Sequence, residues 1–316
     1  MASTRPLLAL AVALLIGVPA CAATAPATGA PTAPPSPATP AAVPVYTLDG
    51  AEHRRPTDVD WDTESRTFFV STYNEGILYR GGLDNPITPV FLRGQPGQTA
   101  DGLRVAGGRI YVCAGTEHQV RVYDLATRQR TGTFETGSGG HVIDLEVTGP
   151  GDVYVTDAIL PLLWHLTPDQ IAAGSGAAQG IPVTPEISIH GDFNLTGIVA
   201  LTDHRLIVSH HADGLLYRID LDANGGRTIA PVTGTVVPLA TGLALDGNRL
   251  VVADGKGLSV LTLGDDAGSA TLVGQIRDPS FRNAVAVAVA GGRYLVANFA
   301  EQGPPPDTVS SVPAIR

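Results

Sequence analysis

The chain has 316 residues, of which 44% are hydrophobic and 16% charged, so it contains enough apolar sequence for a large core. Glycine (37 residues) and proline (25 residues) are abundant, which favours many short strands joined by turns over long helices. The formal net charge of −10 argues against a basic face that binds nucleic acid or an anionic membrane surface.

The first residues have the pattern of an export signal. Arg5 supplies a positive start, an apolar segment follows at 7–18, and small residues end it. We expect a signal peptide over 1–20, because the apolar segment is too short to span a bilayer comfortably. The sequence VPAC, which ends at Cys21, resembles the lipobox of bacterial lipoproteins and implies lipid modification of Cys21. Ordinary cleavage beside Cys21 is the alternative.

A segment rich in alanine, proline and threonine covers residues 21–43. It carries no charge, it cannot build a core, and its prolines keep it extended. We interpret it as a tether between a membrane and a folded domain at 44–316. The expected location is the cell surface or the periplasmic side of a membrane for a lipoprotein, and secretion otherwise. The membrane would be contacted through the lipid anchor only.

The folded part contains six copies of one pattern: an alternating strand, a turn, an apolar run, a polar loop with glycine and a third run. Successive copies begin 42 to 53 residues apart. Repeats of this length, each a small meander, predict a six-bladed β-propeller with four-stranded antiparallel blades. The residues that open the six copies are Thr57, Asp101, Ile143, Thr196, Thr241 and Asn283.

A fourth, outer strand is expected in each copy. The longest interval also carries an insertion at 168–180, which we predict to be a short helix or a surface loop. The sixth copy runs out of chain after its third strand at 308–315. We expect residues 43–50 to supply its outer strand, because that pairing closes the ring and removes two open strand edges. The other outer strands are predicted at 88–94, 130–137, 184–191, 228–237 and 270–278.

Propellers place the first residues of the inner strands, and the loops after the second strands, around one mouth of a central channel. Asp58 and Asp144 lie one residue further along their strands, and strand alternation directs them away from the channel. The residues expected to bind a ligand at the mouth are Thr57, Asp101, Thr196, Thr241, Asn283 and Asn298.

Three inner-strand sequences, DGLRVAGGRIYV (101–112), TGIVALTDHRLIVS (196–209) and TGLALDGNRLVVADG (241–255), share a recurrent pattern. It resembles that of the gluconolactonase and senescence-marker-protein (regucalcin) group of six-bladed propellers, and the resemblance of pattern spans 45–316. It implies a lactone hydrolase with one divalent cation, such as calcium, in the channel.

In that group the cation ligands are a Glu, two Asn and an Asp that open blades one, three, four and five. None of these residues is retained here, and calcium favours six to eight oxygens with carboxylates prominent. The direct support for metal-activated hydrolysis is therefore lost. The corresponding positions in this chain are Thr57, Ile143, Thr196 and Thr241.

Two other residues are candidates for a rebuilt cation site. Asp101 and Asn283 open blades two and six, so both are expected to face the channel. Their oxygens suit a hard cation. The alternative is that they are polar residues that hydrate the channel.

Three histidines are candidates for catalysis. His210 and His211 offer imidazoles for a metal or for general-base chemistry, although adjacent side chains diverge in an extended chain. His141 has Asp144 nearby in sequence, which makes them a candidate acid–base pair. The alternatives are loop or rim positions for the first two and a structural hydrogen bond for the pair.

Two functions follow from the sequence. The first is an exported, membrane-tethered binding or scaffold propeller with a degenerate metal site, whose partner is a small molecule, a glycan or a protein. The export signal, the tether and the missing ligands favour it. The second is a metal-dependent hydrolase of lactones or related esters, which rests on analogy of fold. An enzyme should bring several polar groups to one point of the channel, and a scaffold need not.

Overall fold

The computed structural model describes residues 44–50, 53–191, 193–222, 226–300 and 307–315. The predicted signal peptide, the lipidation site Cys21 and the tether lie outside the described residues. Within the part of the chain that is described, no helix has the length and apolar character needed to cross a membrane.

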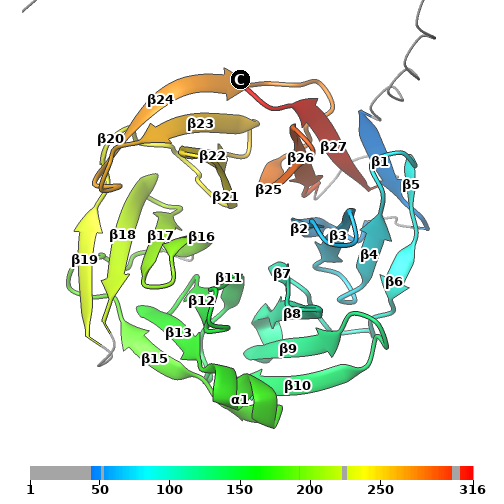
Figure 1. The fold of residues 1–316 in the computed structure, drawn as a ribbon, viewed down its shortest axis with the longest axis horizontal. Coiled ribbons are helices and arrows are strands. Elements are labelled where there is room, and N and C mark those ends of the chain that lie inside the picture. Colours follow the sequence, from blue (N-terminus) through cyan, green and yellow to red (C-terminus); the bar gives the residue numbers. More distant parts are fainter. Residues whose placement is uncertain (1–43, 51–52, 192, 223–225, 301–306, 316) are drawn as a thin grey trace, which may run out of the picture. The chain divides into compact units, whose positions relative to one another are not determined.

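Six antiparallel sheets surround a central channel, as Figure 1 shows, so the predicted six-bladed propeller is confirmed. The inner strands, which face the channel, are β2 (Pro56–Asp62), β7 (Leu103–Ala106), β11 (Val142–Val147), β16 (Leu195–Thr202), β21 (Leu243–Asp246) and β25 (Ala284–Ala290). The second strands are β3 (Thr67–Thr72), β8 (Arg109–Ala114), β12 (Val153–Asp157), β17 (Arg205–His210), β22 (Arg249–Ala253) and β26 (Arg293–Asn298). The third strands are β4 (Leu78–Gly81), β9 (Gln119–Asp124), β13 (Leu162–Leu166), β18 (Leu215–Leu221), β23 (Leu258–Leu263) and β27 (Thr308–Pro313).

The outer strands close the ring. An N-terminal strand pairs antiparallel with β27, with Tyr46 opposite Val309, so the predicted closure is confirmed. The outer strands are β6 (Val90–Leu92), β10 (Arg130–Glu135), β15 (Gln179–Pro182), β19 (Arg227–Pro231), β24 (Ser269–Ile276) and β1 (Val45–Leu48). Three short strands add parallel to the edge of a neighbouring blade; they are β5 (Ile87–Thr88), β14 (Ser175–Ala177) and β20 (Thr233–Gly234).

Blade three differs from the prediction. Its outer strand is β15 and not residues 184–191, which contain turns and no strand. Pro185 has no N–H to give to a ladder, which disfavours a strand there. The inserted segment forms helix α1 (Pro168–Ala173), capped by Thr167, whose side chain accepts from the Gln170 N–H while the Gln170 side chain accepts from the Thr167 N–H.

The core consists of apolar layers between neighbouring blades. Phe68 and Phe69 are adjacent on β3 and both have no exposed area. Phe68 packs with Tyr46 of blade six, whereas Phe69 packs with Phe91 and with the inner strands of blade two. Both faces of a middle strand are thus buried, which explains the nearly continuous apolar runs of the second strands.

A β-bulge at the mouth end of several inner strands changes which side chains face the channel. In blade one Pro56 lies opposite Thr72 and Asp58 opposite Ser71, so Thr57 is an extra residue. Blade three has the same shift before Asp144. The extra residue moves the alternation by one position. Asp58 and Asp144 therefore line the channel cavity, and the expectation that they point away is wrong.

Candidate functional site

A cavity of about 570 Å³ opens at one mouth of the channel, and we call it the mouth cavity. Its wall comes from the starts of the inner strands and from the loops that follow the second strands. Of the residues expected from the sequence, those that line it are Thr57, Asp101, His141, Asp144, Thr196, His211, Thr241 and Asn283.

The threonines that open blades one, four and five form hydrogen bonds to main-chain carbonyls. Thr57 Oγ1 donates to the Ala100 carbonyl of the next blade at 2.7 Å, and Thr196 Oγ1 donates to the Ala240 carbonyl at 2.9 Å. Thr241 donates within its own blade. Their hydroxyl hydrogens are committed to main-chain carbonyls, which gives these positions a structural role.

Two residues that we expected at the mouth lie away from it. Asn298 is buried inside blade six, where its amide donates to Ser310 Oγ at 2.9 Å and its oxygen accepts from the Arg282 N–H at 3.0 Å. His210 is also fully buried, beside the Ser188 carbonyl. The neighbour of His210, His211, points to the cavity instead, as expected for adjacent residues at the end of a strand.

The two candidates for a rebuilt cation site, Asp101 and Asn283, form hydrogen bonds with different neighbours. Asp101 Oδ1 lies 2.9 Å from His141 Nε2, and Asp101 Oδ2 accepts from the Gly115 N–H at 3.0 Å. The Asn283 amide donates to the Phe299 carbonyl at 3.0 Å. Both residues line the cavity, and a shared cation stays a prediction.

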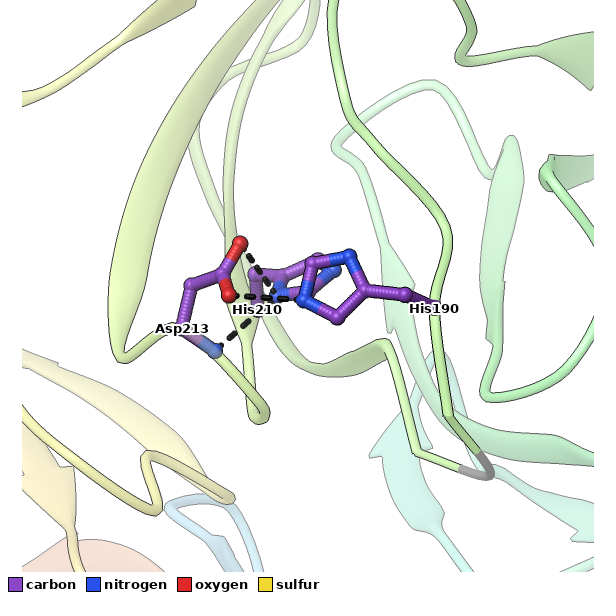
Figure 2. A group of neighbouring side chains, drawn as sticks. All are labelled: His190, His210 and Asp213. Atoms are coloured by element: carbon purple, nitrogen blue, oxygen red, sulfur yellow. Dashed lines mark hydrogen bonds and ion pairs between the residues drawn. The ribbon is translucent and has the colours of Figure 1, made fainter.

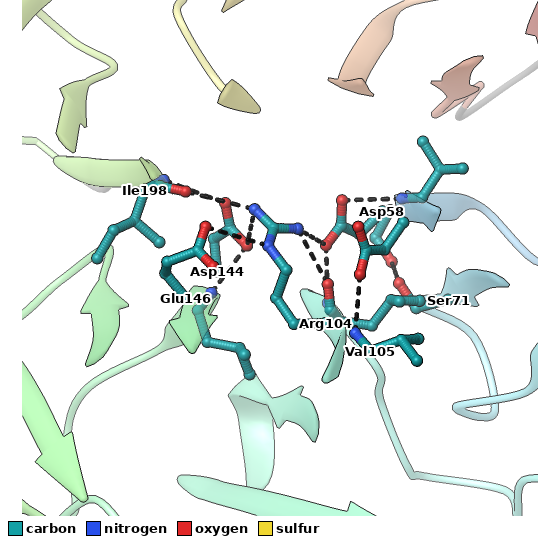
Figure 3. Close-up of polar contacts among 12 residues, drawn as sticks. Asp58, Ser71, Arg104, Val105, Asp144, Glu146 and Ile198 are labelled. Atoms are coloured by element: carbon teal, nitrogen blue, oxygen red, sulfur yellow. Dashed lines mark hydrogen bonds and ion pairs between the residues drawn. The ribbon is translucent and has the colours of Figure 1, made fainter. Parts of the chain in front are cut away.

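A cluster of charged side chains lies in the channel, and Figure 3 shows the polar contacts between Arg104, Asp58, Asp144 and Glu146. The Arg104 guanidinium reaches from blade two across the channel, where Nη2 donates to the Ile198 carbonyl of blade four at 3.3 Å. Its nitrogens lie 3.6 Å from Asp58 Oδ2, 3.8 Å from Asp144 Oδ1 and 3.5 Å from Glu146 Oε2. With Asp60, these residues form what we call the Arg104 cluster.

The carboxylates of the Arg104 cluster also join blades. Asp58 Oδ2 accepts from the Leu103 N–H at 2.7 Å, and Asp144 Oδ2 accepts from the Ile198 N–H at 3.2 Å. On the far side of the cluster lies a second cavity of about 290 Å³, lined by Asp60, Arg104 and Glu146. The cluster therefore separates the two cavities.

Four carboxyl groups surround the Arg104 guanidinium, and burial raises the pKa of each of them. Burial raises the pKa of Asp144 to about 6 and that of Glu146 to about 7, although the charge of Arg104 lowers both. Burial, together with the charge of Asp144, raises the pKa of Asp58 well above its usual value. The cluster therefore holds protons near neutral pH that exposed carboxyls would release.

The wall of the mouth cavity contains a His–Asp pair. Burial by itself lowers the pKa of His141, but the hydrogen bond and the charge of Asp101 raise it above the ordinary value. The main chain of His141 is fixed by its N–H, which donates to Asp157 Oδ1 at 2.9 Å. An imidazole oriented by a carboxylate in a cavity can act as a general base. The partner of His141 is Asp101, and not Asp144 as the sequence suggested.

An aromatic rim surrounds the opening. Phe193 lies 6.5 Å from the His141 ring and 5.9 Å from the His211 ring, measured between centroids, and 47% of its area is exposed. The Tyr73 and Phe299 rings, which also line the cavity, are arranged edge to face with their centroids 6.5 Å apart. The Arg55 guanidinium carbon lies 5.7 Å from the centroid of the Phe299 ring. The cavity thus combines apolar surfaces at the rim with carboxyl and imidazole groups in the wall.

The sequence reasoning missed the Arg104 cluster and the rim. One signal was present, because Arg104, Asp60 and Glu146 are charged residues that alternate with apolar residues inside inner strands. Phe299, like Tyr73, directly follows a second strand, which is a repeat position at the mouth, whereas Phe193 lies in the connection before β16.

No protein-family model and no curated protein matches this sequence. Among solved structures, the chain is similar to the Malassezia sympodialis allergen Mala s 1, with 15% identity, a TM-score of 0.65 and coverage of 86% of this chain and 96% of that one. It is similar to a luciferin-regenerating enzyme, with 14% identity, a TM-score of 0.63 and coverage of 87% and 96%. The WD40 repeats of RRP9 give 10% identity, a TM-score of 0.61 and coverage of 85% and 97%. These likenesses show the propeller fold, which enzymes and WD40 proteins share.

Replacing the channel guanidinium tests the Arg104 cluster. Arg104→Met removes the charge that lowers the pKa values of the surrounding carboxyls. Because the folded pKa values are raised, stability is lost as pH rises from the ordinary values of 3.8 and 4.5 through about 6 and about 7. Without Arg104 that loss continues to higher pH. We expect a destabilisation of about 3–5 kcal/mol at pH 8 and a clearly smaller one at pH 5.

The measurement is urea unfolding of Arg104→Met and of the wild type at both pH values. Arg93→Met, at an exposed position in blade one, is the matched control and should change little. An equal loss at pH 5 and pH 8 would show that the cluster does not contribute through its charges.

Proposed function

We propose that this chain is a non-catalytic propeller that binds a small organic molecule with an apolar or aromatic portion in the mouth cavity. The observation that carries the proposal is the combination of an open, aromatic-rimmed cavity with a channel whose carboxylates are already paired with Arg104. Ligand pockets are typically concave and mostly apolar, with a few polar groups that fix orientation.

The Arg104 guanidinium supplies the positive charge that a channel cation would otherwise bring. It lies among Asp58, Asp144 and Glu146, and it also bonds to main-chain oxygens. A divalent cation in the same place would have to displace a buried cation that belongs to the protein. This supports a degenerate metal site, in line with the loss of the ligand residues at Thr57 and Ile143.

The aromatic rim predicts where a ligand would bind. An amphipathic aromatic anion, anilinonaphthalene sulfonate, should bind in the mouth cavity with one site per chain and be reported by its fluorescence. Phe193→Ser should weaken binding about tenfold, because it removes a large exposed aromatic face. Val273→Ser, at a residue of similar exposure (49%) on the outer strand β24, is the control. Equal binding by both variants would show that the ligand binds outside the mouth cavity.

A second candidate is a hydrolase of lactones or related esters. The observation that favours it is the pair of His141 and Asp101 in the cavity wall, which can activate a water molecule. The notion of a metal-dependent mechanism rests on the resemblance to gluconolactonases and on Asp101 and Asn283 as ligands.

Turnover separates the two candidates. Aliphatic lactones and p-nitrophenyl esters should show no turnover above that of a heat-denatured sample, with or without calcium or manganese. Calorimetry should show no stoichiometric calcium binding. Turnover that is lost in His141→Gln would establish the hydrolase instead, and calcium binding that is lost in Asp101→Ala would restore the metal. Val273→Ser should keep any activity found.

The sequence of the first 43 residues supports export and tethering through Cys21, and we include both in the proposal. The expected outcome is that cells expressing the full chain incorporate a labelled fatty acid into the protein, and that Cys21→Ser abolishes the incorporation. The variant should then be released from the membrane fraction. Labelling that persists in Cys21→Ser would contradict the anchor, and release of the wild type would favour ordinary signal cleavage.

A further inference from the structure

Two histidines and one aspartate converge on the blade-four side of the mouth, outside the cavity wall (Figure 2). His190 belongs to the segment that leads into β16, His210 ends β17, and Asp213 lies in the turn between β17 and β18. His190 Nε2 is 2.8 Å from Asp213 Oδ1, and His210 Nδ1 is 3.5 Å from Asp213 Oδ2. The three ligand atoms all lie within 4.8 Å of one another.

The hydrogen bonds of His210 fix its tautomer. Nε2 lies 2.9 Å from the Ser188 carbonyl, which can only accept, so Nε2 carries the proton. Nδ1 therefore presents a lone pair, which accepts a long hydrogen bond of 3.3 Å from the Asp213 N–H, and a metal ion would take the place of that donor. The Asp213 carboxylate oxygen Oδ2 also lies 3.5 Å from Nδ1, so two acceptors lie close together and repel each other, although His210 is buried and the Asp213 side chain is 32% exposed. A cation between them would remove that repulsion.

Hydrogen bonds from their main-chain N–H groups hold the segments that carry the two histidines. Buried Asn194 accepts the His190 N–H on its side-chain oxygen at 2.8 Å, and its carbonyl accepts the His211 N–H at 2.8 Å. One residue thus fastens both the His190 segment and the end of β17. The contact of His210 with the Ser188 carbonyl is the outer-shell hydrogen bond that usually orients a ligating imidazole.

We propose that His190, His210 and Asp213 form a binding site for a divalent transition metal of the zinc class. Two imidazoles and one carboxylate suit zinc, cobalt and nickel better than calcium, which favours oxygen. Ligand atoms that bind one zinc at about 2.1 Å lie about 3.4 Å apart, so the present separations require only a small shift. The exposed His190 side chain (52%) can supply that shift.

The site would be open on one side. His190 and Asp213 are both accessible to solvent, and three protein ligands leave a fourth tetrahedral position for water or for an anionic group. This inference is independent of the proposed function, because none of the three residues lines the mouth cavity.

The test uses cobalt and zinc with protein prepared without a polyhistidine tag. Cobalt should bind with one ion per chain, give the visible absorption bands of a tetrahedral nitrogen–oxygen site, and be displaced by zinc. His190→Ala and Asp213→Asn should each weaken cobalt binding at least about tenfold. His190 is exposed, so its variant should keep the far-ultraviolet circular dichroism and thermal midpoint of the apo protein.

Another His–Asp pair, away from both the mouth cavity and the proposed site, provides the control. His165 Nε2 lies 2.7 Å from Asp152 Oδ1, at comparable distance but without a second imidazole in the group. His165→Ala should leave cobalt binding unchanged. Absence of binding by the wild type, or equal binding by wild type, His190→Ala and Asp213→Asn, would overturn the proposal.

Discussion

Four of the six blades meet at one buried ionic arrangement, the Arg104 guanidinium among carboxylates in the channel. Inner strands converge there, and their charged side chains are largely shielded from water. The carboxylates of Asp58 and Asp144 accept main-chain N–H groups of neighbouring blades, so they act as joints between sheets. Such joints place negative charge in a confined space. A single guanidinium bound by several of them compensates part of that charge, and raised pKa values compensate more.

The same constraint accounts for the threonines at the start of blades one and four. In the resembling family a cation and its ligands occupy the channel, and the ligands come from the first residues of the inner strands. Here Thr57 and Thr196 donate to carbonyls of the following blade, which joins the blades by direct hydrogen bonds. Arg104, from a strand that supplies no ligand in that family, brings the positive charge. In this chain, hydrogen bonds between blades and the Arg104 guanidinium occupy the channel.

The mouth is assembled from connections whose residue types differ from blade to blade. Phe193 precedes blade four, Phe299 follows the second strand of blade six, and Tyr73 follows the second strand of blade one. These connections lie at one face because corresponding strands of the six blades run in the same direction along the channel. The cavity and the His190 site both use this convergence. They differ in chemistry, since one joins aromatic rings to a His–Asp pair and the other joins two imidazoles to a carboxylate.

The sequence by itself determined the number of blades and the inner three strands of each, because repeat spacing and strand alternation are visible along the chain. It also indicated the closure by β1, because the sixth copy lacks an outer strand and the N-terminal segment is one strand in excess. The sequence pattern also predicted that Thr57, Asp101 and Asn283 lie at the mouth, and all three line the cavity. Tertiary structure alone decided the rest. Bulges turned Asp58 and Asp144 into the channel, a proline-containing segment displaced the outer strand of blade three, and His141 took Asp101 as its partner from another blade. Each of these depends on contacts between segments that are distant in sequence, and periodicity within one strand carries no information about them.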